Sequence, residues 1–151
     1  MEKLTEEQIL SMKEEDILSK LMGTYEVPTA TVILERLGQI PITLKGLTEK
    51  EISKIRKECT YSRKFKGKTE DKFDGNEFDA GLIVAATTNF NWGNTKLLDS
   101  AKASDAKQFI RKKLLAGEIS SLTDKILELS GFNSELEEAE DIKNSSVGAE
   151  E

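Results

Sequence analysis

The chain has 151 residues, a mass of 16.8 kDa and a formal net charge of −6, and this length suits one domain. It contains no histidine and one cysteine. This composition excludes Ser-His-Asp and Cys-His catalysis, imidazole metal sites and an internal disulfide. No apolar run is long enough to span a membrane, and charged residues follow Met1, so we expect neither a transmembrane helix nor a secretory signal.

The negative charge is concentrated towards the end of the sequence. Residues 134–151 contain seven acidic residues and one lysine, so this segment alone carries −6 and residues 1–133 are neutral overall. Few of its side chains are apolar, and burial therefore cannot offset the entropy lost on ordering. We predict three parts: an N-terminal amphipathic helix and linker at 1–28, a folded domain at 29–133, and a flexible acidic tail at 134–151.

The first predicted element is one amphipathic helix. Thr5 and Gln8 have the spacing of a capping box, and Gly23 is a suitable helix stop. Between them, apolar residues recur at near-helical spacing: Ile9, Leu10, Met12, Ile17, Leu18, Leu21 and Met22. This stripe must pack on the domain or on a partner. Ile9, Ile17 and Leu21 are our candidate partner-binding residues, and packing against the hairpin that follows is the alternative.

A β-hairpin is predicted next. β-prone residues at 31–36 and an alternating segment at 39–45 flank Gly38, which is expected at the turn. Pro41 cannot donate a backbone hydrogen bond, which favours an edge position for the second strand. Two strands alone are only marginally stable, so the hairpin should lie on helices.

A charged helix should follow the hairpin directly. Thr48 and Glu51 form a second capping box, and Leu47 and Ile52 stand at the positions of a hydrophobic staple. The predicted helix runs to about Cys59, which we expect to be a small buried hydrophobe and not a nucleophile.

The segment at 61–75 is polar and is predicted to be a loop or a solvent-exposed hairpin. Together with the helix before it, this segment forms a basic run between Lys54 and Lys72, interleaved by Tyr61, Phe65 and Phe73. Such a run resembles a nucleic-acid footprint. The alternative is a solvated helix face that continues into an exposed loop, which we favour because an acidic protein repels phosphate at long range.

Three further helices complete the predicted fold. Asn76 is expected to cap the first of them, the most apolar segment of the chain, which we place at the centre of a bundle. A short turn at 95–100 separates it from a second helix, which Ser104 should cap. The third, at 118–130, should end in a Schellman motif at Gly131. The predicted fold class is α+β and mostly α, with an N-terminal β-hairpin packed on a small helical bundle.

No catalytic, cofactor-binding or metal-binding residues are predicted. The glycines of the charged segment lack the flanking strand and helix of a phosphate loop, and Asp71, Asp74 and Glu77 do not match EF-hand spacing. Trp92, in the break between two predicted helices, is the fourth candidate partner-binding residue, because tryptophan is enriched in binding hot spots. The alternative is that Trp92 closes the bundle from its loop.

The order of the segments resembles that of one protein family. The segments are LGQIPITLKGLTEKE at 37–51, RKECT at 56–60, DAGLIVAATT at 79–88, LLD at 97–99, FIRKKLL at 109–115, GE at 117–118 and ILELSGF at 126–132. This order is similar to that of the XkdN-like tail assembly chaperones of contractile-tailed phages and prophages. The basic insert at 63–72 is longer than the family pattern suggests.

The resemblance implies a non-enzymatic role without a cofactor. Proteins of this family bind the tape measure protein, help to recruit tail tube subunits during tail morphogenesis, and are absent from the mature particle. For this chain the resemblance therefore implies the tape measure protein and the tail tube protein as partners. Self-association is a further partner hypothesis. It also implies activity in the host bacterial cytoplasm.

The resemblance further implies a second, longer product made by a programmed −1 ribosomal frameshift. Residues 142–144, Ile-Lys-Asn, can be encoded by ATA-AAA-AAC, which contains the slippery heptamer A-AAA-AAC. This position lies just beyond the predicted domain. The alternative function is a small bacterial adaptor or regulatory domain that binds nucleic acid through the basic run between Lys54 and Lys72.

Overall fold

The computed structural model describes residues 3–132. The acidic tail predicted at 134–151 and the residues of the frameshift hypothesis, 142–144, lie outside the described residues. The described residues fall into two units, one ending at Glu26 and one beginning at Val27. The division into three functional parts stays a prediction.

The N-terminal unit contains two short helices, α1 (Glu6–Leu10) and α2 (Glu14–Leu21). The predicted capping box is present, since the Gln8 N–H donates to Thr5 Oγ1 (3.1 Å) and the Thr5 N–H donates to Gln8 Oε1 (2.8 Å). Neither helix contains a buried residue. The apolar stripe of this unit is therefore exposed.

The prediction of one continuous helix in this unit is wrong. The Ser11 hydroxyl donates to the Gln8 carbonyl (3.3 Å), and a serine that bonds to a nearby carbonyl competes with the helix ladder. The Lys13 N–H then donates to the Asp16 carboxylate (3.2 Å), which starts a new helix. Local side-chain bonds at the junction thus divide the stripe between two helices.

The predicted β-hairpin is confirmed. β1 (Thr29–Leu34) and β2 (Ile40–Lys45) pair antiparallel, joined by the 3₁₀ turn Glu35–Leu37 and by Gly38, whose φ of 78° favours glycine. One face carries Leu34, Ile42 and Leu44, which are buried. That face covers α4 and α7, as a two-stranded sheet requires.

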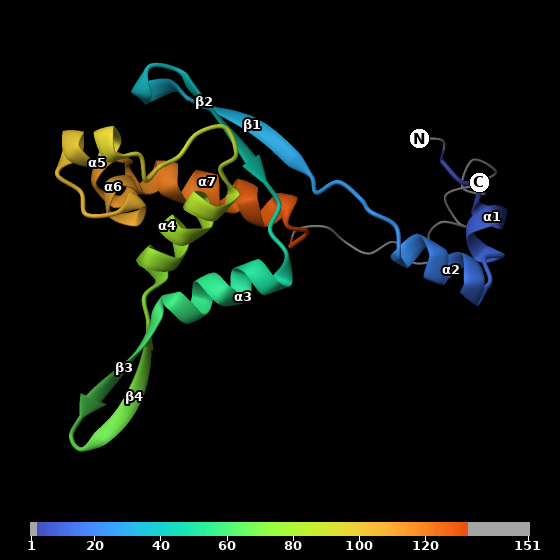
Figure 1. The fold of residues 1–151 in the computed structure, drawn as a ribbon, viewed down its shortest axis with the longest axis horizontal. Helices are drawn as coiled ribbons and strands as arrows, with labels where there is room; N and C mark the ends of the chain where they lie inside the picture. The colour runs from blue at the N-terminus through green and yellow to red at the C-terminus, as the bar shows by residue number, and fades with distance from the viewer. Residues whose placement is uncertain (1–2, 133–151) are drawn as a thin grey trace, which may run out of the picture. The chain divides into compact units, whose positions relative to one another are not determined.

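The rest of this unit is a helical bundle with a second hairpin (Figure 1). Within residues 3–132 the structure has seven α-helices and two antiparallel hairpins, which confirms the predicted α+β, mostly α class. The remaining elements are α3 (Glu49–Glu58), β3 (Thr60–Phe65), β4 (Lys68–Phe73), α4 (Gly75–Ala86), α5 (Thr95–Ala101), α6 (Ala106–Lys113) and α7 (Ala116–Leu129).

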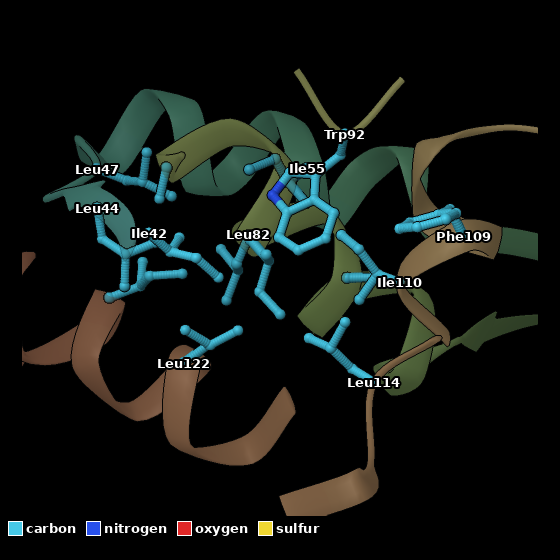
Figure 2. Packing of buried hydrophobic residues seen from close by; sticks show 14 of the residues in the cluster. Ile42, Leu44, Leu47, Ile55, Leu82, Trp92, Phe109, Ile110, Leu114 and Leu122 are labelled. Carbon is cyan, nitrogen blue, oxygen red and sulfur yellow. The ribbon is translucent and has the colours of Figure 1, made fainter. Parts of the chain in front are cut away.

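Helix α4 lies at the centre of the bundle, as predicted, and contacts α3, α6, α7 and β2 (Figure 1). Its Leu82 and Ile83 are fully buried. Figure 2 shows the side chains of Leu82, Ile110 and Trp92 pointing into one cluster. Burying a leucine-sized side chain stabilises a fold by about 1.5–3 kcal/mol, so this cluster holds the bundle together.

Several helix ends match their predicted signals. Thr48 and Glu51 form the second capping box, and Cys59 is buried, which raises the pKa of its thiol. At the end of α7 the Phe132 N–H donates to the Leu127 carbonyl (3.0 Å) and the Gly131 N–H donates to the Glu128 carbonyl (3.1 Å). These two bonds are the predicted Schellman motif.

At two other helices the capping residue differs from the predicted one. Asp74 caps α4 in place of Asn76, since its carboxylate accepts from the Asn76 and Glu77 N–H groups (both 3.1 Å). Asp105 caps α6 in place of Ser104, and accepts from the Gln108 N–H (2.8 Å). In both cases a carboxylate lies within two residues of the expected cap, and it also interacts favourably with the helix dipole.

The segment predicted as a short turn at 95–100 belongs to a helix, α5. The Asn94 side chain accepts from the Lys96 N–H (2.9 Å) and provides the cap. Leu97 and Leu98 of this helix pack against the core, and this tertiary packing stabilises a helix only seven residues long.

Candidate functional site

An apolar groove of about 620 Å³ opens beside Trp92 in the unit that begins at Val27. Its walls come from the β1–β2 turn, the start of β2, the segment after α4, and helices α5 and α6. The lining residues are Leu37, Ile40, Pro41, Asn89, Phe90, Trp92, Leu97, Phe109 and Lys113. Sites that bind ligands or anchoring side chains typically have about 300–1,000 Å³ and few polar groups. Most of the lining residues are aliphatic or aromatic, and Asn89 and Lys113 are the two with an amide or charged side chain.

Three aromatic rings build one wall of the groove. The centroid of Trp92 lies 4.7 Å from that of Phe90, edge to face, and 6.1 Å from that of Phe109. The indole N–H donates to Thr87 Oγ1 (2.9 Å). Trp92 is only 3% exposed, a position that fits the alternative reading, in which it closes the bundle from its loop. Its ring also lines the groove.

Asn89 holds this loop against β2. Its side-chain oxygen accepts from the Thr43 N–H (3.0 Å) and its side-chain nitrogen donates to the Pro41 carbonyl (2.9 Å). The Thr88 N–H also donates to the Thr43 carbonyl (2.9 Å). These bonds fix the spacing between two walls of the groove.

A second set of bonds fixes the hairpin side of the groove. Arg36, next to Leu37, donates to Glu118 through Nη2 (2.7 Å to Oε1) and Nε (3.1 Å to Oε2), and Nη2 also donates to the Lys113 carbonyl (3.0 Å). The Leu115 N–H donates to Glu118 Oε1 (2.7 Å). These donors lower the pKa of the Glu118 carboxyl, with the Arg36 hydrogen bond as the largest cause.

The Glu118→Gln variant is expected to melt at a lower temperature than the wild type at neutral pH. A carboxyl whose pKa is lowered on folding adds stability above its unfolded pKa of about 4.3. This contribution is lost as the pH falls through the lower folded value, so the two melting curves should converge in acid. Thermal melts followed by circular dichroism from neutral to strongly acidic pH provide the measurement.

The matched control is Glu128→Gln, which removes an exposed ion pair between Glu128 and Lys125 (3.4 Å) on α7. Exposed helix pairs contribute little, so this variant should melt close to the wild type throughout. A Glu118→Gln deficit that persists unchanged in acid would contradict the role assigned to the Arg36–Glu118 pair.

The other candidate residues belong to the N-terminal unit. Ile9, Ile17 and Leu21 are 38%, 46% and 74% exposed. Ile17 and Leu21 line a hollow of about 390 Å³ together with Met12, Lys20 and Tyr25. These side chains are thus accessible on the surface of their own unit.

The described residues offer neither a metal site nor a membrane span. Among residues 3–132, no three Cys, Asp or Glu side chains lie close enough to share a metal ion. No helix in that range is long and apolar enough to cross a bilayer.

Comparison with known protein families assigns the chain to one family. The pattern of the family described as phage XkdN-like tail assembly chaperone protein matches residues 18–143. The chain belongs to this family. As a member of the tail assembly chaperones, it is expected to have a non-enzymatic role in binding phage tail proteins. The match includes every residue that lines the groove, whereas Ile9 and Ile17 precede it.

Two relatives come from Bacillus subtilis (strain 168). YqbN is 28% identical over 119 residues, which cover 77% of this chaperone and 80% of YqbN. XkdN, a protein of the phage-like element PBSX, is 27% identical with the same coverage. The crystal structure of YqbN matches with a TM-score of 0.54 at 20% identity, over 73% of this chain and 90% of that one. This likeness confirms the fold.

Proposed function

We propose that this chain is a tail assembly chaperone that binds the tape measure protein and helps to recruit tail tube subunits. It acts in the host bacterial cytoplasm during tail morphogenesis and is absent from the mature particle. Family membership supports the general role, and the apolar groove beside Trp92 is the observation that carries the partner-binding part. The same membership favours this function over a nucleic-acid-binding adaptor.

The groove suits an apolar helix of the tape measure protein. Helices that dock in grooves insert apolar side chains spaced at i, i+3, i+4 and i+7. The aliphatic and aromatic lining of this groove is an apolar surface on which such side chains can pack. Each Å² of apolar surface removed from water contributes about 25 cal/mol. Lys113 is one of the lining residues, and in this proposal its ammonium pairs with an acidic side chain on the flank of that helix. No covalent step is needed, so binding is reversible.

The N-terminal stripe provides a second contact in this proposal. Ile9, Ile17 and Leu21 are exposed on helices that bury none of their residues. Unpartnered apolar side chains of this kind mark interaction surfaces. We propose that they cover a further apolar stretch of the same partner, so that one chaperone shields a longer segment of the tape measure protein.

Co-expression with the tape measure protein of the same phage or prophage tests the groove. The Leu97→Gln variant places a polar amide in the wall and should reduce the amount of tape measure protein that copurifies by about tenfold, because an unpaired polar group is buried on binding. Leu97 is only partly buried, so the variant should remain folded.

The matched control is Leu115→Gln, since Leu115 is 56% exposed and is not part of the groove lining. It should copurify the tape measure protein as the wild type does. Equal copurification by both variants would contradict binding in the groove, and no copurification by the wild-type chain would contradict the proposed partner itself.

We also propose a longer form of the chaperone, produced by a −1 frameshift near residues 142–144. The native gene with its downstream DNA, expressed with an N-terminal tag, should give a minor longer band on an immunoblot. Mass spectrometry of the junction peptide should place the change of frame near Asn144. A single band would contradict this form and leave the groove proposal standing.

A further inference from the structure

We propose that the free edge of β3 binds an acidic polypeptide segment in an extended conformation, by strand addition. This surface is separate from the groove, and its partner need not be the tape measure protein. The observations that carry it are the exposure of the β3–β4 hairpin, the charge difference between its two strands, and the surroundings of its aromatic rings.

The hairpin projects away from the bundle at the junction of α3 and α4 (Figure 1). Every residue of β3 and β4 is exposed. In the described part of the chain this sheet has only these two strands, so one side of β3 keeps its outward N–H and C=O groups unpaired. A free edge of this length is a template for a further strand.

The two strands differ in charge. β3 carries Arg63 and Lys64 and no acidic residue, whereas β4 carries two basic and two acidic residues. The acidic side chains of β4 already have local partners: Glu70 lies 3.6 Å from the Lys72 ammonium, and Asp71 accepts from the Ser62 hydroxyl (3.0 Å). Arg63 and Lys64 form no ion pair with any described residue. The edge at β3 is therefore the electropositive one.

The side chains of β3 alternate in a way that suits an acidic strand. The register pairs Arg63 with Glu70 and Lys64 with Thr69, and neighbouring residues of a strand point to opposite faces. Arg63 therefore lies on the face that carries Tyr61 and Phe65, and Lys64 lies on the other. An added strand finds a cation on each face, and also the rings of Tyr61 and Phe65, which are 55% and 49% exposed.

The ring contacts favour a polypeptide over a nucleic acid. Single-stranded nucleic acids bind by stacking bases on open aromatic faces. The Arg63 guanidinium lies 5.9 Å and the Lys66 ammonium 5.5 Å from the Phe65 centroid, so cations already occupy this ring. Unpaired N–H and C=O groups match a peptide backbone.

Nuclear magnetic resonance titration of the ¹⁵N-labelled full chain tests the proposal. The probe is a short peptide of alternating glutamate and valine, compared with a matched lysine–valine peptide and with a short oligothymidine. We expect only the glutamate peptide to shift the β3 amides, more than those of α7, with an affinity that falls as salt is added. Shifts caused by the oligothymidine alone, or equal shifts with both peptides, would overturn the proposal.

Two charge-reversed variants separate strand addition from general attraction. Arg63→Glu/Lys64→Glu changes β3, and Lys68→Glu/Lys72→Glu makes the same change in charge on β4. The first should weaken binding of the glutamate peptide by about tenfold or more, because like charges then face the added strand, and the second by about threefold or less. Equal losses would overturn the assignment to the β3 edge. Dispersed amide signals report that each variant is folded.

Discussion

Replacement of Trp92 by alanine is expected to lower the free energy of unfolding by about 3–5 kcal/mol. The indole is 3% exposed and packs between Phe90 and Phe109. Its removal leaves a cavity in the core cluster, which also contains the fully buried Ile110 (Figure 2). It also removes the hydrogen bond to Thr87. The same change widens the groove, so a loss of partner binding should accompany the loss of stability.

Urea denaturation followed by circular dichroism measures this effect, because the variant lacks the chain's single tryptophan and gives no indole fluorescence. Trp92→Phe is the informative companion. It keeps an aromatic ring in the core but loses the indole N–H, and should cost about 1–3 kcal/mol. A Trp92→Ala variant as stable as the wild type would contradict the assignment of this residue to the core.

Replacement of Gly46 by alanine is expected to destabilise the fold by about 3 kcal/mol, at the upper end of the range for overpacking. Gly46 is buried between β2 and α3, and an added methyl group would overlap the Leu129 carbonyl oxygen in the last turn of α7. That turn cannot move away freely, because the Leu47 N–H donates to Ser130 Oγ (2.8 Å) and the Ser130 hydroxyl donates to the Ile126 carbonyl (2.6 Å).

Gly117→Ala is the matched control for Gly46→Ala. Gly117 lies in the first turn of α7, and an added methyl group meets no atom within 4 Å. Alanine is the better helix former by about 1 kcal/mol, so this variant should be as stable as the wild type or more stable. Thermal melts of the two variants should therefore move in opposite directions. Similar destabilisation by both would contradict the close approach of Gly46 to α7.

The sequence predicted features that depend on a few neighbouring residues. The capping box of Thr48 and Glu51, the Schellman motif at Gly131 and the turn at Gly38 each follow from local backbone chemistry. The errors in the helix caps also arise from local chemistry. Where two suitable residues stand side by side, as Ser104 and Asp105 do, propensity alone does not decide which of them becomes the cap.

The groove could not be predicted in this way, because its walls are brought together only by the tertiary fold. Leu37, Phe90 and Phe109 are far apart in the sequence and line one cavity. Trp92 was singled out for its residue type, but no local signal places its ring between Phe90 and Phe109. The Arg36–Glu118 pair spans 82 positions and likewise leaves no local pattern.

Site-specific photo-crosslinking from the groove tests the central claim most directly. A photoreactive phenylalanine analogue at position 97, in chaperone co-expressed with the tape measure protein, should crosslink to an apolar helical segment of that protein. Mass spectrometry of the linked peptides identifies the segment. The same analogue at position 115, on the exposed surface outside the groove, should give little product. Crosslinks from position 115 but none from position 97 would contradict the proposal that the groove holds the tape measure protein.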